Sequence, residues 1–247
     1  MNKKLLFSIA LTAILFTACK KETEQVNIAA INDYAPLVVG KYITYNLDSF
    51  VFISFGTKDT TISYQLKYTV DAAITDNLGR PAFRIVQSIR KNNSQPWVIN
   101  NTYTAVNTGT SFEFVENNLR YIKLKQPFTN SFTWKGNSYI ETTATNPSGP
   151  SFLYLNDWDY VYDSVNTSMS IGSLNFANTI KINQRDEVIG NPADAASYSE
   201  INFGAENYAE GIGLIYRKFL HVEYQPPTSS TGYRTGYGVT LTITGHN

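Results

Sequence analysis

Alternation of apolar and polar residues is the feature that most constrains the fold of this chain. Between Thr61 and Val70 every second residue is apolar, namely Ile62, Tyr64, Leu66, Tyr68 and Val70. This period of two is typical of a half-buried β-strand. It recurs in Phe83 and Ile85, Phe112 and Phe114, Ile180 and Ile182, in Leu214, Tyr216, Leu220, Val222 and Tyr224, and in Val239, Leu241 and Ile243. The pattern predicts a protein built mainly of strands.

Turn signals and composition support the same fold class. Runs rich in Asn, Gly, Asp, Ser or Pro separate the strands at residues 76–79, 91–94, 107–109 and 225–232. Aromatic residues make up 14% of the chain and charged residues only 16%, and aromatic residues favour pleated, half-buried surfaces. Beyond the first residues we find no helical periodicity except a short turn near Asp194 to Ala196. We predict a mainly β fold, an antiparallel sheet curled into an open barrel or a sandwich.

The first nineteen residues have the pattern of a lipoprotein signal. Lys3 and Lys4 precede an apolar run from Leu5 to Phe16, and small residues then lead to Cys19, the chain's only cysteine. The run is shorter than the roughly 20 apolar residues that cross a bilayer. We therefore predict a signal peptide over 1–18 and acylation of Cys19, which would anchor the protein to the outer membrane and leave no cysteine for a disulfide or a thiolate site.

Residues 19–33 are polar and mixed in charge, and we interpret them as a flexible tether. Lys20, Lys21 and Glu22 partly match signals that send lipoproteins to the cell surface, so both the periplasmic face and the cell surface stay open. We predict one β-rich domain over 34–247, with a possible subdivision at the Pro- and Gly-rich stretch 146–151. The chain has zero formal net charge and no basic patch, so nucleic acid is not an expected partner.

Four short blocks carry a resemblance to a known family. They are Tyr34 to Tyr42 with Tyr45, Trp134 to Asn137, Tyr208 to Leu214, and Gly238 to Leu241. These blocks resemble motifs of uncharacterised lipoproteins of the Bacteroidota, although Ile43 stands where that family often has tryptophan. The Tyr208 block also resembles β-rich envelope proteins with half-barrel sheets. The resemblance implies an envelope location and a β-rich fold, and it implies no particular activity.

Residues suited to catalysis are few. His221 and His246 are the only histidines. His221 shares the polar register of its strand with Arg217 and Glu223, so we predict that both histidines lie on the surface. Neither has a His or Cys partner at ligand spacing, and we predict no metal and no cofactor. Asp157 and Asp159 flank Trp158, a grouping that binds a sugar or a hard cation, which makes them candidate ligand-binding residues. They would share a face of an extended strand, as in a carboxylate-based glycan hydrolase, or they could belong to a solvated loop.

Aromatic residues offer a stronger case for ligand binding. Trp97, Trp134 and Trp158 can line a concave site for a glycan or an acyl chain, or they can belong to the core of the sheet. We predict a non-enzymatic binding or interaction module for a hydrophobic or glycan ligand or an envelope protein. The alternatives are a glycan hydrolase that uses Asp157 and Asp159, and a structural envelope subunit.

Two further local signals concern modification and changes of chain direction. Asp59-Thr60-Thr61 and Asp163-Ser164-Val165 resemble the O-glycosylation acceptor pattern of exported Bacteroidota proteins, which makes Thr60 and Ser164 candidate sites. Gly211 and Gly213 indicate a sharp bend in a strand, and Gly40 indicates a turn into the first long strand.

Overall fold

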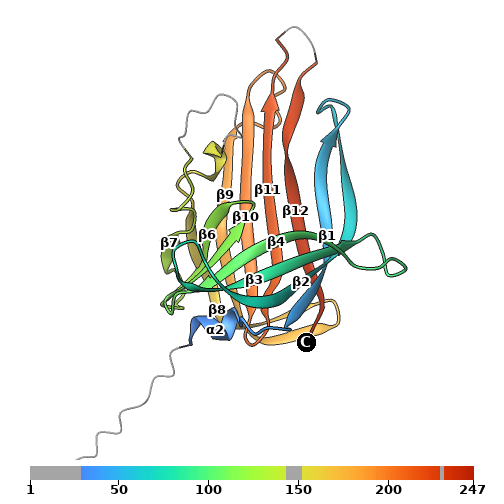
Figure 1. Cartoon of the computed structure of the whole chain (residues 1–247). Helices are drawn as coiled ribbons and strands as arrows, with labels where there is room; N and C mark the ends of the chain where they lie inside the picture. The colour runs from blue at the N-terminus through green and yellow to red at the C-terminus, as the bar shows by residue number, and fades with distance from the viewer. Residues whose placement is uncertain (1–28, 143–151, 229–230) are drawn as a thin grey trace, which may run out of the picture.

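The fold is one antiparallel sheet of twelve strands that curls into a nearly closed barrel (Figure 1). The computed structural model describes residues 29–142, 152–228 and 231–247. The spatial order is β6-β5-β4-β3-β2-β1-β12-β11-β10-β9-β8-β7. The strands are β1 (Tyr42–Ile53), β2 (Lys58–Thr75), β3 (Pro81–Arg90), β4 (Val98–Asn107), β5 (Ser111–Glu116), β6 (Leu119–Lys125), β7 (Thr133–Lys135), β8 (Asp159–Ile171), β9 (Leu174–Gly190), β10 (Ser199–Ala209), β11 (Gly213–Gln225) and β12 (Tyr233–His246). The predicted fold class is therefore confirmed, in its barrel form.

The barrel has one unsealed seam, between β6 and β7. No strand ladder joins these two strands, but a few bonds bridge them. The Ile122 amide donates to the Gly136 carbonyl at 2.8 Å, and Trp134 Nε1 donates to the Ile122 carbonyl at 2.8 Å. The Tyr162 hydroxyl donates to the Lys125 carbonyl at 2.7 Å. One backbone bond and two side-chain bonds thus hold the two edges together where the strand ladder is missing.

A short helix closes one end of the barrel. The helix α2 (Ile31–Tyr34) lies at the same end as the C-terminus, opposite the end at which β11 finishes and β12 begins (Figure 1). Ile31 and Tyr34 are each 1% exposed and belong to the core. The prediction of a flexible tether over 19–33 is wrong for its last residues, because Ile31 lies in α2 and its apolar side chain is buried in the barrel core. The predicted signal peptide and Cys19 lie outside the described residues, as does the stretch 146–151.

The predicted strand faces are right for β2 and wrong for β11. Leu66 is buried in the interior, as its alternation predicts. In β11, however, the polar register faces inward: Arg217 pairs with Glu206 across the sheet, and His221 pairs with Asn202. His221 is only 6% exposed, so the prediction of a surface position is wrong for it, whereas His246 is exposed. The interior accepts these polar groups because other buried polar side chains bind them.

The turn predicted at Gly40 is confirmed, whereas the bend predicted within a strand at Gly211 and Gly213 is instead a hairpin turn between two strands. Gly211 and Gly213 have φ of 72° and 113° and form the tight connection between β10 and β11. Gly40, with φ of 93°, precedes β1. Positive φ is easily adopted only by glycine, which explains these residues. The turn expected at 194–196 lies between β9 and β10.

Candidate functional site

A cavity of about 110 Å³ lies inside the barrel at the α2 end. Its walls are mostly apolar, and they come from the segment before β1 and from the interior faces of β1 to β5 and of β11. The apolar residues at the cavity include Leu37, Ile43, Val70, Ile85, Phe112 and Phe114. Lys41, Tyr42 and Asn247 also line it, and because Tyr42 and Asn247 are exposed, they place its mouth at the surface.

Four charged side chains form what we call the interior cluster, and three of them, Lys123, Glu206 and Arg217, line this cavity. The four are Lys123 on β6, Glu206 on β10, Arg217 on β11 and Glu116 on β5. Lys123 Nζ lies 2.6 Å from Glu206 Oε1, and these side chains are 5% and 1% exposed. Arg217 Nη1 lies 2.8 Å from Glu116 Oε2. Two cations and two anions balance, so the cluster ties opposite walls of the barrel together without a net charge.

Tyrosine hydroxyls complete the surroundings of the cluster. The Tyr208 hydroxyl donates to Glu206 Oε2 at 2.8 Å, and the Tyr45 hydroxyl donates to the Leu214 carbonyl at 2.8 Å. Burial alone would raise the pKa of Glu206, but Lys123 and Arg217 outweigh it and the pKa is lowered. Burial lowers the pKa of Lys123, an effect that Glu206 opposes. Glu206 is therefore a carboxylate, and its negative charge keeps the buried ammonium in place.

The cavity's chemistry suits a small apolar guest. At about 110 Å³ the cavity is smaller than an apolar cavity of about 150 Å³ that binds benzene in another protein, so its size limits a guest to a molecule no larger than about benzene or to the end of a longer chain. Sugar rings need polar partners along their rims, and here the polar groups already bind one another. Hydrophobic contact is what the walls offer.

The three tryptophans do not form one site. Trp134 is 4% exposed and Trp158 is 2% exposed, and both belong to the core. Trp158 Nε1 donates to the Tyr154 carbonyl at 2.7 Å. Trp97 lies in the connection between β3 and β4, where the guanidinium of Arg90 stacks over its ring at 4.2 Å. Of the two interpretations of these residues, a ligand site or the core of the sheet, the core is correct for Trp134 and Trp158.

Asp157 and Asp159 do lie together, and both form an ion pair with Lys135. Lys135 Nζ is 2.7 Å from Asp157 Oδ1 and 2.9 Å from Asp159 Oδ1. The carboxylates are 72% and 59% exposed. The hydrogen bond from Lys135 lowers the pKa of Asp157. A general acid at neutral pH needs the opposite shift, which burial normally supplies, so this pair has the character of a solvated surface bridge.

His221 lies in a polar and aromatic layer further along the barrel interior. Its ring stacks on Tyr154 with centroids 3.9 Å apart, and its Nδ1 lies 2.8 Å from Asn202 Oδ1. Burial lowers the pKa of His221, although Glu223 and Glu200 oppose this. The neutral ring is thus a packed and hydrogen-bonded part of the interior, and His221 is not one of the residues that line the cavity.

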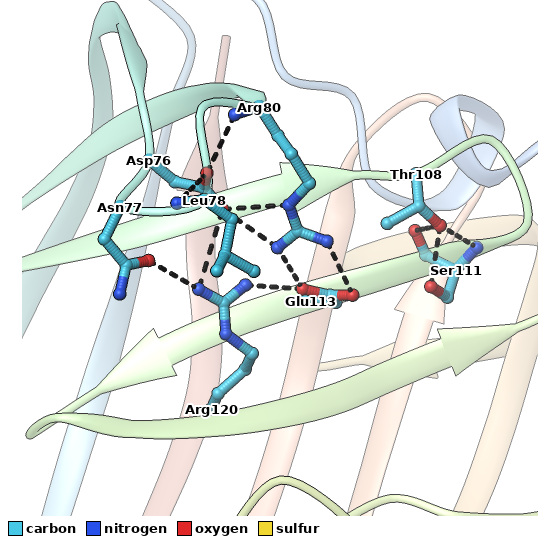
Figure 2. A network of polar contacts seen from close by, with 8 residues as sticks. All are labelled: Asp76, Asn77, Leu78, Arg80, Thr108, Ser111, Glu113 and Arg120. Carbon is cyan, nitrogen blue, oxygen red and sulfur yellow. Dashed lines mark hydrogen bonds and ion pairs between the residues drawn. The ribbon is translucent and has the colours of Figure 1, made fainter.

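A second group of four charges, which we call the outer cluster, lies at the β2–β3 turn (Figure 2). Arg80 bonds both Asp76 and Glu113, with Nη2 at 2.9 Å and 2.7 Å from their carboxylate oxygens. Arg120 bonds Glu113 and also approaches Asp76 at 3.6 Å. Asp76 further accepts the amides of Leu78 and Arg80. Every charge is matched, so this cluster fastens the turn to β5 and β6 and offers no open ligand position.

The candidate modification sites occupy strands. Thr60 lies in β2 close to the β1–β2 hairpin, and Ser164 lies in β8, where it accepts a hydrogen bond from Thr167 at 3.3 Å. Both are partly exposed. In the described part of the chain, no three His, Cys, Asp or Glu residues gather to hold a metal ion.

Sequence reasoning missed Lys123, Glu206 and Arg217. The signal that points to Glu206 is its position two residues before Tyr208 in a strand whose other residues are nearly all uncharged. Among the described residues no helix is long and apolar enough to cross a membrane. Comparison of the chain with protein-family models and with curated proteins gives no match.

Proposed function

We propose that this chain is a non-enzymatic lipoprotein of the outer membrane, anchored through Cys19, and that it binds a small hydrophobic ligand in the barrel cavity. The observation that carries the proposal is the apolar lining of the cavity together with its mouth beside Tyr42 and Asn247. Burial of apolar surface is the driving force, worth about 25 cal/mol for each Å² removed from water.

The position of the cavity fits membrane anchoring. The chain reaches the barrel at α2, and Ala35, Pro36 and Leu37, which follow it, line the cavity. Cys19 precedes the first described residue by ten positions, a span of at most roughly 35 Å. An anchored barrel would thus hold the mouth near the bilayer surface, where hydrophobic molecules are concentrated. The ordered hydrophobic walls favour this ligand class over a glycan.

Native mass spectrometry of the protein purified gently from its own host tests the proposal. We expect a non-covalent mass that disappears on denaturation. Ala105 is fully buried and lines the cavity, so Ala105→Leu should fill the space and remove most of the bound mass. Ala73→Leu adds the same atoms at an exposed position of β2 and should leave ligand binding unchanged.

The proposal fails if the wild-type protein carries no ligand and also gains none when offered benzene or a short alkane in solution. It also fails if Ala105→Leu folds and retains the full ligand mass. Circular dichroism and thermal unfolding of both variants establish that any loss of ligand is not a loss of fold.

A further inference from the structure

The outer surface of the sheet carries a groove that the proposed function does not use. It has a volume of about 520 Å³ and lies over β1, β2, β10, β11 and β12. We define the outer groove by its apolar residues Phe50, Phe52, Ile201, Leu220 and Val222, all of them half-buried. On β11, Leu220 and Val222 alternate with Arg217 and His221, which face the interior, so they face outward. Ile201 pairs with Val222, and Phe50 stands in one row with Leu220, so Ile201, Phe50 and Phe52 face outward as well.

The strand register shows how the groove arises. Gly238 stands between Phe50 on β1 and Leu220 on β11. A Cβ at Gly238 would lie only 3.0 Å from Leu220 Cδ1 and 3.1 Å from Phe50 Cβ. The two apolar walls therefore close in over a strand that has no side chain at this point. A contiguous apolar depression on an outer surface is typical of an interaction site.

The charges around the groove are divided between its two sides. Asp48 on β1 and Asp59 on β2 lie on one side, and Lys218 on β11 lies on the other. Arg234 belongs to the middle strand β12, but its guanidinium lies over the ring of Tyr224 on β11, 5.3 Å from the ring centroid, and so extends toward the Lys218 side. All four are exposed, and within the described ranges none of them belongs to an ion pair. Asp48 and Lys218 flank Thr240 in the same row of the sheet, so acid and base stand on opposite sides of the floor.

This division makes the surface complementary to itself. A two-fold axis that runs parallel to the strands brings the same patch of two subunits together, with each side of one patch facing the other side of its copy. Such a rotation would set the acidic side of one chain against the basic side of the other, twice, around a shared apolar centre. An apolar centre with a charged rim is the usual anatomy of a protein interface. We propose that two copies of this chain associate as a two-fold dimer through the outer groove.

Charge reversal tests the proposal on the full chain in nonionic detergent, with density-matched sedimentation equilibrium. Wild type should be dimeric. Asp48→Lys with Asp59→Lys makes both sides basic, and Lys218→Glu with Arg234→Glu makes both sides acidic, so each double variant alone should weaken the dimer at least tenfold. Mixed in equal amounts with different affinity tags, the basic and acidic variants should co-purify as a heterodimer.

A matched control reverses a pair elsewhere on the barrel. Lys181 Nζ lies 2.7 Å from Asp163 Oδ2 on β8 and β9, and both are partly exposed. Asp163→Lys with Lys181→Asp should leave the dimer intact. The heterodimer also shows that both double variants are folded.

A monomeric wild type, double variants that still dimerise, or a mixture that fails to pair would each overturn the proposal. If the monomer instead binds vesicles of phosphatidylethanolamine and phosphatidylglycerol, and Phe50→Ser removes that binding, the groove faces lipid and the dimer is likewise overturned.

Discussion

The interior cluster and the outer cluster contain the same kinds of charge, yet their surroundings differ. Each has two acids and two bases. Both contain buried carboxylates, since Glu206 is 1% exposed and Glu113 is 3% exposed. The cations paired with them differ: Lys123 is 5% exposed, whereas Arg80 and Arg120 are 30% and 15% exposed. The second interior pair, Arg217 and Glu116, is 15% and 16% exposed. If a carboxylate is removed, water can solvate the arginines that remain in the outer cluster, but it cannot solvate Lys123 in the interior cluster. Removing one partner of an ion pair should therefore lower the free energy of unfolding much more in the interior cluster than in the outer cluster.

The largest effect is expected from Glu206→Gln. It leaves the Lys123 ammonium buried without its carboxylate, which should cost about 3–5 kcal/mol in the free energy of unfolding. Urea denaturation followed by tryptophan fluorescence measures this. Lys123→Met combined with Glu206→Gln removes both charges and keeps an acceptor for Tyr208, so the double variant should be more stable than Glu206→Gln alone. A double variant as weak as the single one would show that the ion pair is not the cause.

A smaller loss is expected from Glu113→Gln in the outer cluster. Arg80 and Arg120 would keep Asp76 and gain water, so we expect about 1–3 kcal/mol from the lost charged hydrogen bonds. The same urea denaturation measures it. If Glu113→Gln lowers the free energy of unfolding as much as Glu206→Gln, then the exposure of the remaining cations does not distinguish the two clusters.

Alkaline pH should report on the barrel interior. Burial raises the pKa of Tyr103 to about 12, with a further contribution from Glu116. Because the folded pKa lies above the unfolded value of about 10, the stability that the neutral hydroxyl provides is complete below pH 10 and is lost as the pH rises toward 12. We expect a loss of about 1–2 kcal/mol from this group.

Thermal unfolding between pH 9 and 12 measures this dependence. Tyr103→Phe removes the ionisable group and should flatten the curve, whereas Tyr139→Phe, at a residue 57% exposed, should not. Equal curves for wild type and Tyr103→Phe would contradict the assignment.

Acid pH should report on the outer cluster and give the smallest effect. The Arg80 amide, the Arg80 side chain and the Leu78 amide lower the pKa of Asp76 to about 2. A lowered pKa means that the carboxylate stabilises the fold above its unfolded value, near pH 3.9, and that this contribution is lost as the pH falls toward 2. Thermal unfolding from pH 5 to 2 should show this loss, and Asp76→Asn should reduce the slope. Asp71→Asn, in the same hairpin, serves as the control.

Local patterns predicted much of this fold and little of its interior chemistry. The period of two located β2, β9 and β12, and Gly40 located the turn before β1, because both follow from backbone geometry. Gly211 and Gly213 marked a change of chain direction, but the sequence did not show that it separates two strands. The assignment of faces in β11 was wrong, since Arg217 and His221 look like a solvated register when read alone. The tryptophans likewise gave no indication of whether Trp97 would share a site with Trp134.

By itself, the sequence determined the strand content, the hairpin turns and the antiparallel order, because these depend on neighbours along the chain. Only the tertiary structure decided that the sheet closes into a barrel, that Lys123 meets Glu206, and that Phe50 and Leu220 lean over Gly238. These contacts join residues far apart in the chain. A strand pattern specifies two faces, but curvature and pairing across the barrel decide which face is dry and what each buried charge will meet.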